Sequence, residues 1–117
     1  MANANENINF KITQGDTFQL EITYEDINNV PINLTGYTFV LEVRDKPGGS
    51  ILCATCSLGD GIAVSAPTTG FITVTISSEK TKNFNLPKSA YQLQAILGNS
   101  KTTLAQGWFE VNAGVIN

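Results

Sequence analysis

Histidine is absent from the 117-residue sequence, and arginine occurs once, as Arg44. The chain therefore has no side chain whose ordinary pKa suits a general base near neutral pH. A single arginine also cannot form a clamp of several guanidinium groups around an anionic substrate. Carboxylates such as Glu21, Glu25 and Asp26 fall in strand or turn positions that a solvated surface explains. The sequence thus predicts a protein that is not an enzyme and that needs no cofactor.

Charge is also sparse, because charged residues make up 15% of the chain and the net charge is −3. The lysines are scattered and are not interleaved with aromatics as in a nucleic-acid-binding surface. No apolar run approaches the roughly 18 residues that a membrane span needs. The start of the chain, MANANENINF, lacks the basic and apolar regions of a secretion signal. We therefore expect no nucleic-acid or membrane partner, and folding in the cytosol of the producing cell.

The only two cysteines, Cys53 and Cys56, form a C-x-x-C pattern. They lie in SILCATCSL, which is typical of a strand, whereas a redox motif lies in a turn before a helix. Residues three apart on a strand point to opposite faces and lie about 10 Å apart, too far for a disulfide. A zinc site would need further ligands, and the chain has no histidine and no third cysteine. The sequence predicts two free structural cysteines and no metal site.

What the sequence does contain is a series of stretches that alternate apolar and polar residues, the mark of strands with one buried face. The two clearest are residues 17–25 and 37–44, separated by EDINNVPINLTG, which is rich in turn-forming Asp, Asn, Pro and Gly. We expect these two strands to seed a sheet to which the other strands are added. Those other strands are expected at residues 8–13, 32–34, 50–58, 62–66, 71–77, 89–97 and 102–111.

Turn residues separate these strands. Gly15 and Gly36 each lie between two alternating runs, where a positive φ is needed, and Asp16 can accept a hydrogen bond from the backbone that follows it. The sequence Gly59-Asp60-Gly61 is typical of a tight hairpin turn. A single helical turn is expected through residues 79–81, capped by Ser77 or Ser78.

The strand count of seven to nine, with short turns and no long helix, predicts an all-β domain with antiparallel strands, and parallel sheets are excluded in practice. The expected architecture is an immunoglobulin-like β-sandwich of two antiparallel sheets. A small closed barrel is the alternative. We expect a polar N-terminal arm at 1–7, one domain at 8–113 and a tail at 114–117.

The single tryptophan, Trp108, lies on the last expected strand, on the same face as Gln106 and Glu110. If Phe109 and Val111 on the other face point into the core, Trp108 points outward. An exposed aromatic residue on a polar strand face is typical of an interface anchor. We therefore predict Trp108, Gln106 and Glu110 as an interface. The reverse arrangement, with Trp108 in the core, would follow from a slip or bulge in the strand.

The order of several short motifs carries a resemblance that spans about residues 8–113. The motifs are Gly15-Asp16-Thr17-Phe18, Pro31-Ile32-Asn33-Leu34-Thr35-Gly36, a strand ending in Arg44 before a Gly-rich loop, Tyr91-Gln92-Leu93-Gln94, and Gly107-Trp108-Phe109-Glu110-Val111. This order resembles that of small phage tail and baseplate domains, similar to the N-terminal domain of baseplate upper proteins. The resemblance implies an immunoglobulin-like β-sandwich that attaches a receptor-binding fibre to the baseplate or tail.

The function implied is that of a non-enzymatic virion protein, an adaptor that joins tail or baseplate components through protein contacts. It would be present in multiple copies in the virion, after assembly in the host cytoplasm. The relatives usually continue into a fibre-forming segment, whereas this sequence ends at Asn117, which raises a capsid-cement or neck role as an alternative. A carbohydrate-binding module is a further alternative, with Trp108 as its candidate for stacking on a sugar.

Overall fold

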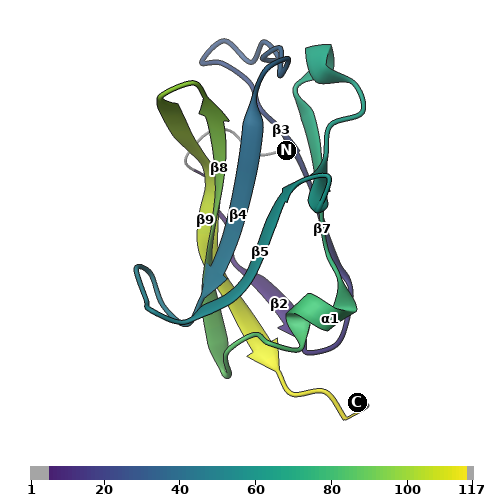
Figure 1. The fold of residues 1–117 in the computed structure, drawn as a ribbon, viewed down its shortest axis with the longest axis vertical. Coiled ribbons are helices and arrows are strands. Elements are labelled where there is room, and N and C mark those ends of the chain that lie inside the picture. Colours follow the sequence, from purple (N-terminus) through teal and green to yellow (C-terminus); the bar gives the residue numbers. More distant parts are fainter. Residues whose placement is uncertain (1–5, 116–117) are drawn as a thin grey trace.

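The computed structural model describes residues 6–115, which form nine strands and two short helical turns (Figure 1). The strands are β1 (Glu6–Asn7), β2 (Phe10–Thr13), β3 (Phe18–Thr23), β4 (Thr38–Arg44), β5 (Leu52–Leu58), β6 (Gly61–Ala63), β7 (Phe71–Ile76), β8 (Lys88–Leu97) and β9 (Ser100–Asn112). The helical turns are η1 (Pro67–Thr69) and α1 (Ser78–Thr81). The expectation of an all-β domain is confirmed.

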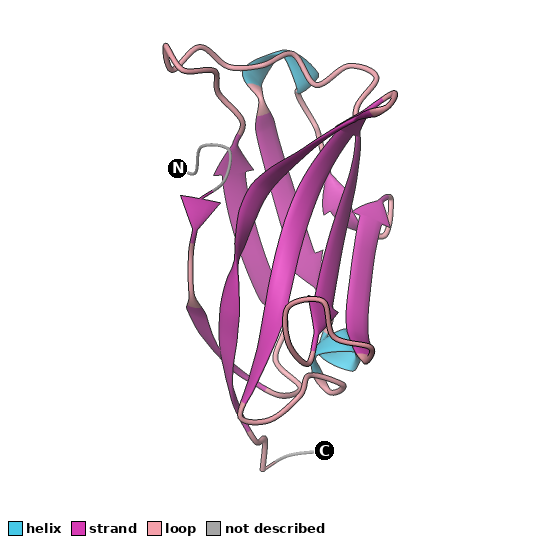
Figure 2. Ribbon diagram, turned by 90° about the vertical axis from the view of Figure 1, so that its left-hand side faces the viewer, coloured by secondary structure: helices cyan, strands magenta, loops and turns pink. Residues whose placement is uncertain are grey.

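All nine strands belong to one mixed sheet, in the order β1-β9-β8-β4-β5-β6-β7-β3, with β2 also paired to β9. The sheet curls round until its two edges, β2 and β3, approach each other (Figure 2). Rings on these two edge strands touch, with the centroids of Phe10 and Phe18 5.0 Å apart. Two separate antiparallel sheets were expected, and the hydrogen bonding instead gives one nearly closed, barrel-like sheet.

Parallel pairing, which the sequence pattern excluded, occurs at three places. Both β1 and β2 run parallel to β9, and β5 runs parallel to β6. The part of the expected N-terminal arm that the structure describes, Glu6–Asn7, is therefore a strand of the sheet, while residues 1–5 lie outside the described residues. Alternation of apolar residues reports which face of a strand is buried, and it carries no information on strand direction.

The predicted hairpin at Gly59-Asp60-Gly61 is wrong. The chain coils there, so that Ser57 pairs with Gly61 and Leu58 with Ile62 in parallel. Gly59 and Gly61 both have positive φ, at 82° and 97°. A Cβ on Gly61 would lie 2.7 Å from the carbonyl oxygen of Thr75, so the coil needs glycine at this position.

The two strands expected to seed the sheet are not neighbours. β3 pairs with β7, whereas β4 lies between β5 and β8. The strand expected at 32–34 does not form, and the connection contributes one isolated bridge between Glu25 and Pro31. Pro31 lacks an N–H group and so offers a ladder only its carbonyl.

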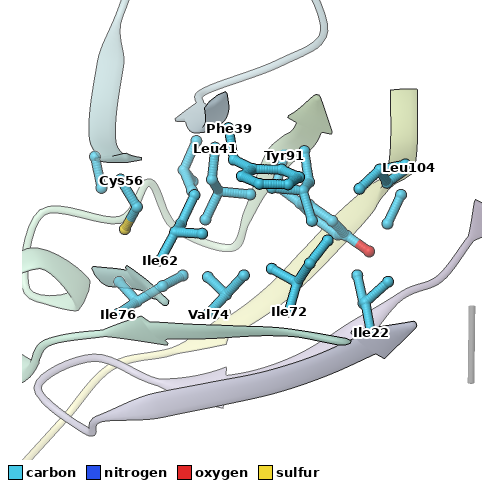
Figure 3. Close-up of a cluster of buried hydrophobic side chains, with 14 of the residues drawn as sticks. Ile22, Phe39, Leu41, Cys56, Ile62, Ile72, Val74, Ile76, Tyr91 and Leu104 are labelled. Atoms are coloured by element: carbon cyan, nitrogen blue, oxygen red, sulfur yellow. The ribbon is translucent and has the colours of Figure 1, made fainter. Parts of the chain in front are cut away.

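The core fills the space that the curled sheet encloses (Figure 3). Alternate residues of β7 point inward and are almost fully buried: Ile72, Val74 and Ile76. An aromatic cluster surrounds Phe109, whose ring centroid lies 4.9 Å from that of Tyr91 and 5.2 Å from that of Phe84. The stabilising term is burial of apolar surface, roughly 25 cal/mol per Å².

Two β-bulges interrupt the alternation that the sequence shows, one in the β4–β5 pair and one in the β8–β9 pair. In β5, Val43 pairs with Ala54 and Arg44 with Leu52, so Cys53 is the extra residue. Because of this bulge, Cys53 and Cys56 both belong to the buried core, not to opposite faces. Both cysteines are free in the structure, as predicted.

The helical turn α1 forms where it was expected. The Ser77 hydroxyl caps it by accepting a hydrogen bond from the N–H of Lys80. Thr81 of α1 is fully buried, and its hydroxyl donates to the carbonyl of Asp16 at 2.8 Å while accepting from the N–H of Gly15 at 3.0 Å. α1 therefore fixes the turn between β2 and β3.

Candidate functional site

A groove of about 760 Å³ lies on the outer face of β4, β8 and β9. Its walls are the β4–β5 loop on one side and the β1–β2 segment on the other. The lining residues are Asn7, Asn9, Glu42, Arg44, Lys46, Pro47, Gly48, Ala90, Tyr91, Gln92, Gln106, Gly107 and Trp108. Four of them are primary amides, which offer both donors and acceptors.

Strand register explains why these residues meet. Glu42 pairs with Gln92, and Gln92 with Gln106, which makes one row across three strands. Two positions along, Arg44 pairs with Ala90 and Ala90 with Trp108. Directly opposed residues on neighbouring strands point to the same face.

The second row explains the hollow itself. Ala90, with the smallest side chain that carries a Cβ, stands between the long Arg44 and Trp108 side chains. The floor of the groove is therefore low at Ala90 and is bounded by a guanidinium group on one side and an indole on the other.

Trp108 is half-buried, while its neighbour Phe109 is 1% exposed and lies in the core. The Lys88 ammonium lies 4.2 Å from the centroid of the indole ring, within the range of a cation–π contact. The backbone N–H of Trp108 donates to the Asn9 side chain at 2.9 Å. Trp108 is thus held in place by its neighbours and remains accessible at the groove.

The opposite wall is ordered by Arg44. Its Nε and Nη2 donate to the same carboxylate oxygen of Glu42, at 3.1 and 2.9 Å, and its Nη1 donates to the carbonyl of Gly49 at 3.1 Å. Three of the five N–H donors of the guanidinium are used in this way. Arg44 therefore ties the β4–β5 loop to the sheet and keeps two N–H groups for another acceptor.

Tyr91 joins the groove to the core. Its hydroxyl donates to the carbonyl of Ile8 at 2.6 Å and so holds the segment between β1 and β2 on the sheet. Burial raises the pKa of the Tyr91 hydroxyl far above its usual range, because the phenolate would lose its hydration. The close approach also depends on Gly107, where a Cβ would meet the same Ile8 carbonyl.

The residues predicted as an interface do not all reach the groove. Gln106 and Trp108 line it, whereas Glu110 lies one row further along β9, paired with Lys88 and Lys11. Whether this set forms an interface stays a prediction.

The predicted turn residues lie away from the groove. Gly15 and Gly36 have φ of 88° and 86°. Asp16 donates its N–H to the carbonyl of Thr13 and accepts from Thr81 through its own carbonyl.

A second polar cluster lies between β5 and α1. The Lys80 ammonium donates to Asp60 at 2.9 Å, to the carbonyl of Thr55 at 2.7 Å and to the Cys56 sulfur at 3.7 Å. Burial raises the pKa of the Cys56 thiol, although the Lys80 charge lowers it in part. Lys80 therefore ties α1 to β5 by donating to a carbonyl of that strand.

Within residues 6–115, no group of three or more Cys, Asp or Glu side chains is arranged to hold a metal ion. Neither described helical turn is long or apolar enough to cross a membrane.

Sequence reasoning found Trp108 and missed the groove. Arg44, Ala90 and Lys46 became part of it only through the pairing of β4 with β8 and of β8 with β9. The outward positions on each strand were readable from alternation, but the neighbours of each strand were not.

Comparison with known proteins gives a likeness in fold only. No protein-family model and no curated protein matches the chain. Among solved structures, the chain is similar to one described as the N-terminal domain of phage TP901-1 ORF48. The TM-score is 0.52 and the identity 10%, over 96% of this chain and 99% of that one.

Proposed function

We propose that this protein is a non-enzymatic structural component of a phage virion, an adaptor that joins tail or baseplate components through its surface. The observation that carries the proposal is Trp108, an accessible aromatic side chain on an otherwise polar strand face beside a groove. Tryptophan is enriched at binding hot spots because it buries a large area and freezes few rotamers.

Two further observations support the proposal. The order of sequence motifs resembles that of phage tail and baseplate domains. The fold is similar along its whole length to a domain of a phage protein. Together they favour a virion role, in which this chain contacts other virion proteins and is present in several copies.

The β4–β5 loop supports a protein contact at the groove. Arg44 holds this loop on the sheet through its bonds to Glu42 and to the carbonyl of Gly49, and an ordered loop loses less conformational entropy when it docks.

The test begins with mass spectrometry of purified phage particles from cells that carry the gene, which should detect the chain. Trp108→Ala should then leave the melting temperature within a few degrees of the parent and reduce incorporation at least tenfold. Leu58→Ala, which also truncates an exposed apolar residue but far from the groove, is the matched control. Normal incorporation of the Trp108 variant would contradict the proposed contact.

A further inference from the structure

The connection between β3 and β4 carries an isoleucine almost entirely in solvent. Ile27 is 96% exposed, and Val30 in the same loop is 54% exposed. Single exposed apolar residues are common on protein surfaces, so exposure alone indicates little. The geometry of the loop and its charge add two further observations.

The loop is held in one shape by Asp26. Its carboxylate accepts from the N–H of Asn28 at 2.8 Å and from that of Val30 at 3.0 Å, and its own N–H donates to the Val30 carbonyl at 2.9 Å. A segment that is ordered before binding loses less conformational entropy when it docks. We call residues 25–30 the tip.

The tip is acidic. Glu25 and Asp26 precede Ile27, and no lysine or arginine lies between Lys11 and Arg44 in the sequence. The tip therefore presents an apolar side chain next to carboxylates, with no positive charge on the loop.

The groove is complementary to the tip in charge and in shape. Lys46 is exposed on its rim, and Arg44 keeps two N–H donors after its bonds to Glu42 and Gly49. The floor is low at Ala90, beside the apolar ring of Trp108. A branched aliphatic side chain flanked by a carboxylate matches this arrangement.

The tip and the groove lie toward opposite ends of the molecule. Figure 1 shows the β3–β4 connection at the top and the β4–β5 loop, which walls the groove, near the bottom. The long axis of the described structure measures 43 Å. The tip of one copy therefore meets the groove of another copy and not its own.

We propose that the groove binds the tip of a second copy of this chain, with Ile27 over Ala90 beside Trp108 and Glu25 facing Lys46 and Arg44. The inference rests on the proposed function in that it names a partner for the same contact surface. The contact is heterologous, so repetition gives a ring or an open row of copies. A single contact of this small size is weak in isolation and strengthens in an assembly.

The experiment is sedimentation velocity on the purified protein, from micromolar to millimolar concentration in low salt. The parent should self-associate with increasing concentration. Ile27→Ser removes the apolar side chain of the tip and leaves the groove unchanged. Lys46→Glu reverses a charge at the groove and leaves the tip unchanged. Each variant alone should self-associate at least tenfold more weakly than the parent. Leu58→Ser and Lys82→Glu, with the same chemical changes elsewhere, should behave as the parent does.

Mixing the variants tests the geometry. Equal amounts of Ile27→Ser and Lys46→Glu should form a heterodimer that does not grow, because the intact tip of the Lys46 variant fits the intact groove of the Ile27 variant and the reverse contact is broken on both sides. Circular dichroism of every variant should match the parent, which excludes misfolding as the cause.

A parent that stays monomeric at millimolar concentration, or a mixture that forms no heterodimer, would overturn the inference. If the purified protein is monomeric while Trp108→Ala still blocks incorporation into particles, the proposed function stands and the groove has another occupant. If the heterodimer forms but the chain is absent from particles, only the proposed function fails.

Discussion

Tyr91 links the core to the first strands through one hydrogen bond, from its hydroxyl to the carbonyl of Ile8. Burial raises the pKa of this hydroxyl above the 10.0 of an exposed tyrosine. Below pH 10 the folded and unfolded chains both keep the proton. Above it the unfolded chain ionises and the folded chain does not, so stability is lost as the pH rises.

We expect the free energy of unfolding to fall above about pH 10, by at most about 1.4 kcal/mol per pH unit for this one group. Tyr91→Phe should be less stable by about 1–2 kcal/mol at pH 7, since the Ile8 carbonyl loses its donor. The free energy of unfolding of Tyr91→Phe should also fall less steeply between pH 10 and 11 than that of the parent. Urea unfolding from pH 7 to 11 measures both effects, and equal slopes for parent and variant would assign the alkaline loss to other groups.

The cysteine pair is predicted to be replaceable. Cys56 is 1% exposed and Cys53 is 8% exposed, and both are free. Changing both to alanine should cost no more than a few kcal/mol, the range for small cavities in a core. Assembly should be unaffected. Intact mass under native conditions checks the thiols, and a disulfide or bound zinc would contradict the prediction.

Sequence alternation predicted that Trp108 points outward and Phe109 inward, and it left the reverse arrangement open. The alternative with Trp108 in the core needed a slip or bulge in this strand, at Gly107. The bulge that does occur lies earlier, at Leu104, which the ladder passes over between Ala105 and Thr103. Leu104 and Phe109 are therefore both buried, whereas strict alternation would place them on opposite faces. A bulge depends on the neighbouring strand, so the strand's own residues did not reveal it.

Among the elements, the turns at Gly15 and Gly36 lead to a third prediction. Both residues have positive φ, and a Cβ would have open space at Gly15 and ordinary contact with Leu97 at Gly36. Alanine at either position therefore costs backbone strain without a steric clash, about 1 kcal/mol. Thermal unfolding of each single variant measures this cost.

The control is the reverse exchange at Ala63, which is an exposed strand residue. Ala63→Gly should lower the melting temperature, because glycine makes the unfolded chain more flexible. Melting temperatures of Gly15→Ala and Gly36→Ala equal to that of the parent would show that the two turns tolerate a side chain.

The sequence located most strands and could not say how they pair. Residues 71–77 and 89–97 were placed within one or two residues of β7 and β8, because their alternation is regular and bounded by turn residues. The order of strands depends on which faces pack together in three dimensions. The stretch at 32–34 has apolar residues at strand spacing, but Pro31 and the turn at Gly36 leave it no ladder to join.

At the scale of the whole molecule, charge is unevenly placed in a way that composition hides. The net charge of −3 suggests a weakly acidic surface. The tip has Glu25 and Asp26 and no lysine or arginine, whereas Lys46 is exposed at the groove, where Arg44 is paired with Glu42 and Lys88 lies opposite Glu110. The carboxylates of the tip and the exposed Lys46 would favour a head-to-tail approach of two copies.

Of the candidate site, the sequence predicted two residues of one strand, Trp108 and Gln106. Trp108 is unique in the chain and lies on a polar strand face, both of which are visible in the sequence. The groove needs Asn9 from the first strands, Arg44 from β4 and Ala90 from β8, and these positions are brought together by long-range pairing. No local pattern links residues so far apart.

The pairing of β1 and β2 with β9 also sets the order in which the molecule can be completed during its synthesis. Phe10 of β2 is made long before its partner Phe109, which lies on β9, the last described strand of the sheet in sequence order. Until then the first strands have no ladder to join and the aromatic end of the core stays open. The nascent chain therefore holds an unfinished sheet edge until β9 has been made, and closure of the barrel is a late folding step, as is typical of contacts between distant residues.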